Sequence, residues 1–214
     1  DGGRVALEHE TPLRLEPAPA VAARDDFDAT ELALCWNYLR NPDLALYSLA
    51  ERPGCLRLRG SKDGLDDVGS PAWVGRRQCH FSVRVSACVE FRPAAEREEA
   101  GLVVRMNEQH HYEIFVTRRS GAPAVVVRRR IGSLRAEVAC RALSRDDSRL
   151  VLSIAADKDK YVFSYGRSEG DLLPLGEGET RYLSTEVAGG FTGVYFAMYA
   201  SGNGGPWSAA AVFD

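Results

Sequence analysis

Apolar and polar side chains alternate without a break between residues 81 and 91. The apolar set is Phe81, Val83, Val85, Ala87, Val89 and Phe91, and the polar set is Ser82, Arg84, Ser86, Cys88 and Glu90. Successive side chains of a β-strand point to opposite faces, so this period of two predicts a strand with one buried face. Strand patterns also occur at residues 56–59, 114–117, 125–127, 161–165 and 194–199.

Short segments rich in Gly, Pro, Asp and Ser separate these runs, at residues 52–54, 120–123, 157–160, 166–170 and 201–206. No long amphipathic helix is visible, although residues 30–36 and 43–50 have room for a helical turn or two. Many short strands with little helix predict an all-β fold, a jelly-roll β-sandwich of two antiparallel sheets. A propeller is disfavoured because the sequence has no repeat of about 40 residues.

The chain divides by composition into a short first segment and one domain. Residues 1–23 hold Pro12, Pro17 and Pro19 among alanines and are interpreted as an extended Pro/Ala-rich linker. Residues 24–214 are interpreted as the sandwich. The net charge of −3 gives no general attraction to nucleic acid, and no apolar run is long enough for a spanning helix, so neither nucleic acid nor a membrane is an expected partner.

The five cysteines are widely spaced, odd in number and without a C-x-x-C pair. This distribution is typical of reduced cysteines and not of a disulfide framework or a zinc site. It predicts a cytoplasmic protein. Secretion stays an alternative, because a signal peptide would already be removed from a mature chain.

The sequence by itself supplies no catalytic set. It contains no phosphate-binding loop and no nucleophile elbow. His110 and His111 are adjacent on an expected strand, so their rings point to opposite faces and are interpreted as partly exposed side chains. The acid pairs at 66–67, 98–99 and 146–147 are interpreted as solvated loop residues, and the arginine runs, such as 128–130, as ion-pairing partners across strands.

Several spaced motifs carry a family resemblance. They are Asp26-Phe27-Asp28, residues 51–60 (ERPGCLRLRG), residues 70–81 (SPAWVGRRQCHF), Ala100-Gly101-Leu102, Asn107 with Tyr112, and Gly189-Gly190-Phe191-Thr192-Gly193. From about residue 24 to the end, the chain resembles the C-terminal concanavalin A-like β-sandwich module of bacterial β-xylosidases in glycoside hydrolase family forty-three. In that family the module follows a five-bladed propeller that carries the catalytic carboxylates.

The resemblance implies an accessory domain that packs on a catalytic propeller. This chain alone would then not be catalytic, whereas its parent would hydrolyse O-glycosyl bonds as a β-xylosidase or α-L-arabinofuranosidase. The loop at Phe191 would place its ring at the rim of the propeller's substrate pocket, where an apolar ring packs on a sugar face and excludes water. The alternative for Phe191 is an ordinary core phenylalanine after a glycine turn.

Sandwiches of this kind also hold a structural calcium ion, and the matching positions are Asp26 or Asp28, a backbone carbonyl in residues 54–60, and Asp214. Carboxylate and carbonyl oxygens suit this hard cation. The alternative is that these acids cap turns.

Two other functions are compatible with the sequence. The first is an autonomous carbohydrate-binding module, whose stacking platform for xylo-oligosaccharides would be Trp73, Tyr195, Tyr199 and Trp207, with Arg76 beside Trp73 as a polar contact. The second is a free-standing sandwich enzyme, which needs two carboxylates facing one bond. For that role the expected strands offer only isolated acids such as Glu90 and Glu113.

Overall fold

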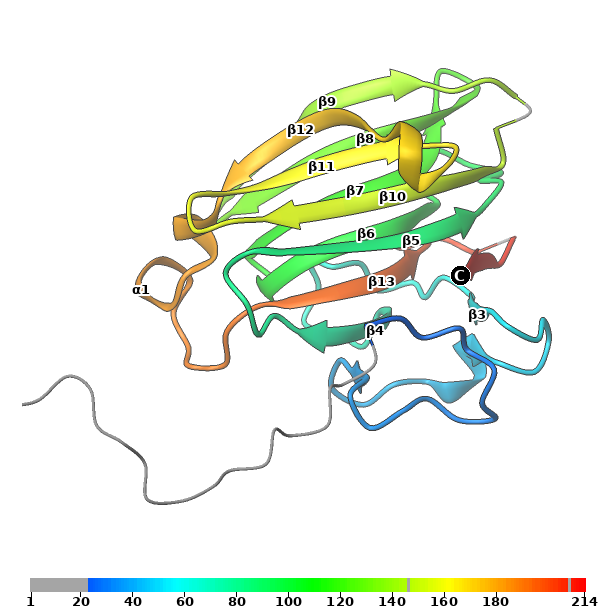
Figure 1. Ribbon diagram of the computed structural model, residues 1–214. Helices are drawn as coiled ribbons and strands as arrows, with labels where there is room; N and C mark the ends of the chain where they lie inside the picture. The colour runs from blue at the N-terminus through cyan, green and yellow to red at the C-terminus, as the bar shows by residue number, and fades with distance from the viewer. Residues whose placement is uncertain (1–22, 146, 208) are drawn as a thin grey trace, which may run out of the picture.

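The computed structural model describes residues 23–145, 147–207 and 209–214, and these residues form two antiparallel sheets of seven strands each (Figure 1). The first sheet has the strand order β1 (Asn37–Tyr38), β4 (Ala72–Arg77), β13 (Tyr195–Ser201), β6 (Glu99–Asn107), β7 (His110–Arg119), β8 (Ala122–Ile131), β9 (Leu134–Ala142). The second has the order β12 (Leu173–Glu179), β11 (Lys160–Gly166), β10 (Arg149–Ala156), β5 (Val83–Glu90), β14 (Ala211–Phe213), β3 (Leu56–Leu58), β2 (Tyr47–Ser48). The predicted all-β sandwich is confirmed.

The main core lies between the two sheets. Ile114 and Val127 of the first sheet belong to the same buried cluster as Leu58, Leu152 and Phe213 of the second. The longer strands contribute alternate residues to this cluster, because their intervening side chains point away from the partner sheet. The period of two in the sequence therefore reports which face of each strand is apolar.

The predicted strand at residues 80–91 begins later than its alternation indicates. Strand β5 spans Val83–Glu90, whereas His80 and Phe81 lie in the preceding loop and Phe81 is 82% exposed. The placement of Phe81 on the buried face was therefore wrong. The ladder between β5 and β10 starts at Val83, so the residues before it leave the sheet.

Helical structure is short throughout the described residues. The 3-10 helices are η1 (Leu44–Leu46), η2 (Glu169–Asp171) and η3 (Thr180–Leu183), and helix α1 spans only Thr185–Ala188. Among the described residues, none of these helices approaches the length and apolar character needed to cross a membrane. The expected linker, residues 1–23, lies outside the described residues except for Ala23.

The C-terminal strand pairs with two strands from much earlier in the sequence. Strand β14 inserts between β3 and β5, and the backbone of Asp214 exchanges hydrogen bonds with that of Cys88. All five cysteines are free, which agrees with the reduced state expected from their spacing.

A second, smaller apolar cluster covers part of the outer face of the first sheet. Its strand residues are Trp73, Val103, Phe115, Val126, Ala197 and Tyr199. Leu65, from the loop between β3 and β4, packs onto them and is only 4% exposed. This loop therefore gives the outer face a partial third layer, and it buries polar side chains that strand alternation alone would leave in water.

Candidate functional site

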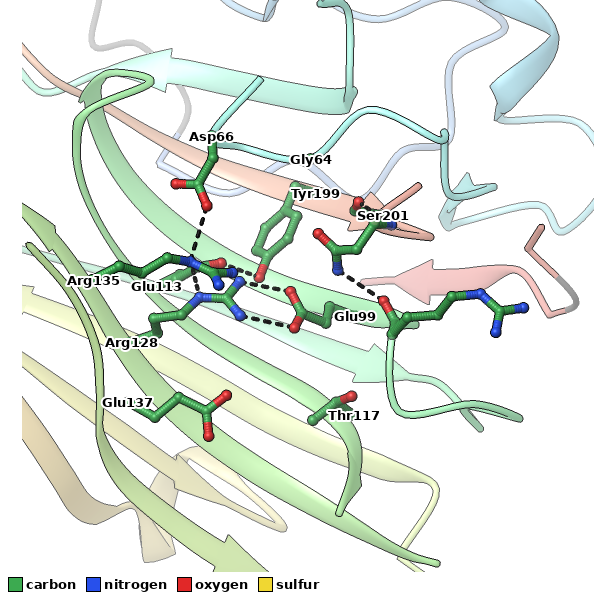
Figure 2. A network of polar contacts seen from close by, with 12 residues as sticks. Gly64, Asp66, Glu99, Glu113, Thr117, Arg128, Arg135, Glu137, Tyr199 and Ser201 are labelled. Carbon is green, nitrogen blue, oxygen red and sulfur yellow. Dashed lines mark hydrogen bonds and ion pairs between the residues drawn. The ribbon is translucent and has the colours of Figure 1, made fainter. Parts of the chain in front are cut away.

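A buried ion-pair network lies on the outer face of strands β6, β7 and β8 (Figure 2). Arg128 donates from Nη1 to Glu99 Oε1 at 2.8 Å, from Nη2 to Glu99 Oε2 at 2.6 Å, and from Nε to Glu113 Oε1 at 2.6 Å. Tyr199 donates its hydroxyl to the other oxygen of Glu113. Every nitrogen of the guanidinium and every oxygen of both carboxylates thus has a partner.

The network is held by packing as well as by charge. The guanidinium of Arg128 lies 4.5 Å over the ring of Phe115, which belongs to the outer apolar cluster. Burial alone would lower the pKa of Arg128, but the charges of Glu113 and Glu99 and the hydrogen bond to Glu99 raise it well above its ordinary value. Burial raises the pKa of Tyr199, and Glu113 raises it further. Arg128 therefore stays charged and the Tyr199 hydroxyl stays protonated.

This arrangement corrects two expectations about the acids. Glu99 was expected in a solvated loop, yet it is the first residue of β6 and is 4% exposed. Glu113 was expected to be isolated, yet it shares Arg128 with Glu99. The expectation of arginine pairing across strands is confirmed, since β7 and β8 place Glu113 opposite Arg128. Of the pair at 146–147, Asp146 lies outside the described residues, and Asp147 pairs with Arg167 at 3.0 Å.

The paired carboxylates do not form a glycosidase pair. A glycosidase needs one carboxylic acid free to protonate a leaving group and a second carboxylate facing the sugar ring or a water. Both oxygens of Glu99 accept from Arg128, and those of Glu113 accept from Arg128 and Tyr199. Neither carboxylate presents an unpaired oxygen to a substrate. The network instead links the side chains of β6, β7, β8 and β13 across the outer face of the sheet.

His111 precedes Glu113 by two residues on β7, so its side chain lies on the same outer face. It is 1% exposed, which corrects the prediction of a partly exposed ring. Its Nδ1 lies 3.2 Å from the carbonyl oxygen of Asn107, and its Nε2 lies 3.4 Å from Asp66 Oδ1. Burial lowers the pKa of His111 to about 3, although the negative charge of Asp66 acts in the opposite direction. The ring is therefore neutral at ordinary pH. His110 is half-buried, as expected.

A groove opens above the network. Residues of strands β6 to β9 line its floor, and the loop at 64–67 and the turn at 203–204 line its sides. The cavity has a volume of about 500 Å³. At its edge Asp66 accepts from Arg135 Nε at 2.9 Å, and Glu137 pairs with Arg119.

The four aromatic residues expected as a stacking platform do not share one exposed surface. Trp73 is 2% exposed and Tyr199 is fully buried, and both belong to the outer apolar cluster. Tyr195 packs edge-on against Trp73 with ring centroids 5.7 Å apart. Trp207 stacks on Phe91 at the border of the main core. Arg76 lies over Trp36 and not over Trp73.

Two of the acids expected to bind calcium form ion pairs with arginines. Asp214 accepts from Arg24 at 2.8 Å and from Arg149 at 3.3 Å, and Asp26 also pairs with Arg24. Asp28 Oδ1 and the backbone carbonyl oxygen of Asp26 both lie beside Gly54, 3.5 and 3.8 Å from the position that a Cβ atom would take there. Among the described residues no group of three His, Cys, Asp or Glu side chains is arranged to hold a metal ion. The expected ligand set also included a backbone carbonyl oxygen, and calcium binding stays an untested prediction.

Phe191 is fully exposed at one end of the sandwich. Its loop follows α1 and leads into β13, and Gly189, Gly190 and Gly193 have positive φ angles of 74°, 78° and 69°. Asn107 donates to the carbonyl of Ala188 at 2.9 Å and so fixes the loop's first half. Only glycine adopts these angles without strain, so the backbone turns sharply on both sides of the ring. The same end carries exposed Phe81 and Val187.

The family model described as the beta xylosidase C-terminal concanavalin A-like domain matches residues 24–214. This chain belongs to that family.

Relatives of this β-xylosidase C-terminal domain occur in longer proteins. The non-reducing end alpha-L-arabinofuranosidase BoGH43B of Bacteroides ovatus is 41% identical over 191 residues, which are 89% of this chain and 36% of the relative. The xylosidase/arabinosidase of Butyrivibrio fibrisolvens is 31% identical over 158 residues, which are 74% of this chain and 30% of the relative. The chain thus spans about a third of the length of these relatives.

Solved structures give the same result. The Bacteroides ovatus xyloglucan PUL GH43B matches with a TM-score of 0.85 and 38% identity over 92% of this chain and 39% of that one. The xylan beta-1,4-xylosidase of Bacillus halodurans matches with a TM-score of 0.86 and 27% identity over 95% of this chain and 40% of that one. The expected family and fold of the β-xylosidase C-terminal domain are both confirmed.

Sequence reasoning missed the residues around Arg128 and His111 for one reason. The burial of His111 and Glu99 depends on the loop between β3 and β4, and nothing in strand alternation shows a third layer. One signal was available. Charged residues at 99, 105, 113 and 128 lie in or beside apolar strand runs, where an unpaired charge is costly and a buried ion pair is therefore indicated.

Proposed function

We propose that this chain is the accessory domain of a longer glycoside hydrolase that acts on xylose- or arabinose-containing chains. It docks on the catalytic propeller of that protein and helps to close its substrate pocket. The family match and the names of the longer relatives support this proposal. The domain itself supplies binding surface and shape, while the catalytic carboxylates belong to the propeller.

The observation that carries the proposal is the exposure of Phe191 on a turn flanked by glycines. A phenylalanine ring without contacts in its own domain leaves a large apolar area in water, which is unfavourable unless a partner covers it. The glycines around it permit the turn, and the hydrogen bond from Asn107 to the carbonyl of Ala188 ties the start of the loop to β6. The core alternative for Phe191 does not agree with this exposure.

Neighbouring loops extend the docking end. The backbone N–H of Gln78 donates to the carbonyl of Val194 at 3.0 Å, so the loop with Phe81 lies directly beside the loop with Phe191. Phe81 is 82% and Val187 47% exposed. We define the docking end as the loops at 78–82 and 185–194. Its apolar side chains suit the flat or concave surface of another folded domain.

Kinetics of the full-length enzyme test the rim role. Phe191→Ala is expected to raise KM or lower kcat on aryl xylosides or arabinosides by about tenfold, because the lost ring contributes roughly 1–2 kcal/mol of apolar contact. Leu173→Ala is the matched control, since Leu173 is also exposed but lies at the opposite end of the sandwich. Unchanged constants for Phe191→Ala would remove the rim role.

Thiol protection tests docking independently of kinetics. Cys79 is exposed in the docking end, and Cys140 is exposed on β9 at the opposite end. Alkylation of Cys79 is expected to be slower in the full-length protein than in this chain alone, whereas Cys140 reacts equally in both. Equal rates for Cys79 would contradict docking through this end.

The carbohydrate-binding alternative in its original form loses its support. Its aromatic platform depended on Trp73 and Tyr199, and both rings are covered by the loop between β3 and β4.

A further inference from the structure

A small cavity lies on the outer face of the first sheet, next to the loop that carries Phe191. Its lining includes Trp73 of β4, Arg105 of β6 and Tyr195 of β13, together with Thr192 from the loop. The cavity has a volume of about 190 Å³. This is about six times the share of one water molecule in the liquid, and well below the roughly 300–1,000 Å³ of pockets for drug-sized ligands. The cavity therefore suits a group of a few atoms.

Two buried donors belong to side chains of this lining and have no acceptor. Arg105 Nε and Trp73 Nε1 lack a hydrogen-bond partner among the described residues. Their side chains are deeply buried, since Arg105 is 6% exposed and Trp73 is 2% exposed. The Tyr195 hydroxyl accepts from Arg77 and donates to none of the described residues, so its proton is also available. A buried N–H without an acceptor is costly, and it indicates a group that the domain does not itself supply.

The cavity is also positively charged. Arg105 is the one ionised side chain among the described residues that line it, and none of these residues is acidic. Glu108, which does not line the cavity, accepts from Arg105 Nη2 at 3.3 Å, and the same oxygen accepts from Arg40 Nη2 at 3.1 Å. One carboxylate thus serves two guanidinium groups, whereas the buried Arg128 has two carboxylates of its own. Burial lowers the pKa of Arg105 to about 10, and the charge of Arg40 lowers it further. A second negative charge would complete the pairing of this buried cation.

We propose that this cavity binds a carboxylate group, held by the charge of Arg105 and by the donors of Trp73 and Tyr195. A carboxylate has two oxygens that only accept, so it can take all three hydrogen bonds and balance the charge. Two sources have this chemistry. One is a free small carboxylate such as acetate, and the other is an Asp or Glu side chain of the catalytic domain, because Thr192 of the docking end lines the same cavity. The second source rests on the proposed function, and the first does not.

The test is a titration of the 214-residue chain with sodium acetate, followed by NMR of the indole N–H signals. The Trp73 signal is expected to move to higher frequency and to saturate with a Kd of about 1–30 mM. Trp207 is the internal control, because its Nε1 is also buried without a partner but its ring stacks on Phe91 and does not line this cavity.

Sodium chloride and acetamide are the comparison titrations, since chloride matches the charge of acetate and acetamide matches its shape. Both are expected to bind at least tenfold more weakly than acetate. Equal affinity for either one would overturn a carboxylate site. The absence of a saturable shift at Trp73 up to about 100 mM acetate would overturn the proposal as well.

Two variants locate the contact. Tyr195→Phe removes one donor and keeps the ring, and it is expected to weaken acetate binding by about tenfold, the loss typical of one hydrogen bond to a charged group. Tyr182→Phe is the matched control: each of these hydroxyls accepts from an arginine that lies over its own ring, Arg77 for Tyr195 and Arg181 for Tyr182. Arg105→Gln is expected to abolish saturable binding. Unchanged affinity in Tyr195→Phe would overturn the proposal even if Arg105→Gln does not fold.

The full-length protein, labelled with nitrogen-15 in its tryptophans, separates the two sources. A carboxylate from the catalytic domain would leave the Trp73 signal already shifted and insensitive to acetate, whereas a site for free carboxylates would keep the response of the isolated chain. A signal that is neither shifted nor responsive would mean that a group without a carboxylate covers the cavity, and it would overturn the proposal. Failure of the acetate titration leaves the kinetic and thiol tests of docking unaffected, so the two proposals fail separately.

Discussion

Glu113 and Arg128 face each other across strands β7 and β8, with Oε1 and Nε 2.6 Å apart and both side chains almost completely buried. A buried ion pair adds little stability over an apolar pair of the same shape, because each charge must first be removed from water. Removal of one partner, however, is strongly destabilising, because the other charge then stays in the interior without compensation.

Arg128→Met is therefore expected to reduce the free energy of unfolding by about 3–5 kcal/mol, since it leaves the carboxylates of both Glu99 and Glu113 unpaired. Urea unfolding followed by tryptophan fluorescence measures this loss. Lys160→Met is the control, because its pair with Glu177 is exposed and is expected to contribute less than about 1 kcal/mol. A similar small loss for both variants would show that water reaches the buried network.

Stability is expected to fall in mild acid because of His111. Burial lowers its folded-state pKa from 6.5 to about 3, so between these values the unfolded chain binds a proton that the folded chain does not. The free energy of unfolding therefore decreases as the pH falls below 6.5. The contribution of this one ring is about 3 kcal/mol between pH 6.5 and about pH 4.5, as an upper bound.

Urea midpoints measured at several pH values check this expectation. In His111→Gln the slope between neutral and mildly acidic pH should be shallower than in the wild type, while carboxylates still contribute the remainder. Parallel slopes for His111→Gln and wild type would contradict a neutral buried ring.

Gly101 on β6 is expected to tolerate no side chain. A Cβ atom at this position would lie 2.1 Å from the carbonyl oxygen of Ile114 and 2.5 Å from Cα of Phe115, both in the backbone of β7. Gly101→Ala must push two central strands apart, and a loss of about 1–3 kcal/mol or more follows from such overpacking. Gly170→Ala, where a Cβ atom would lie 3.8 Å from Ser168 Oγ, is expected to stay within about 0.5 kcal/mol of wild type. Thermal unfolding distinguishes them.

Much of the fold follows from local patterns. Alternation in the strands that became β5, β11 and β13 reports directly which side chains face the partner sheet, because the period of a strand is fixed by its backbone. The pairing of Arg128 across strands was also predictable, since a guanidinium in a buried strand needs a carboxylate on its neighbour. The family resemblance supplied the exposed role of Phe191, for which the residues alone gave a core alternative.

The rest depended on contacts between distant segments. His111 is buried because Leu65 and Asp66, nearly fifty residues earlier, fold over its face of the sheet. Trp73 lost its role as a sugar platform for the same reason. Phe81 left the strand although its pattern continued, because the β5 ladder begins only at Val83. Periodicity indicates the faces of one strand, and it contains no information about which loop covers them.

Phe191→Ala is expected to leave the isolated domain as stable as the wild type, within about 0.5 kcal/mol, because the exposed ring buries no area within the chain. Phe213→Ala is the matched control. The ring of Phe213 is completely buried between the sheets, and its removal is expected to cost about 3–5 kcal/mol. Calorimetry or urea unfolding of both variants gives the comparison.

A substantial loss of stability in Phe191→Ala would mean that the ring packs against its own domain in solution, and the exposed surface proposed for docking would then not exist. An unchanged stability, combined with altered kinetics of the full-length enzyme, would separate the function of this residue from the folding of the sandwich.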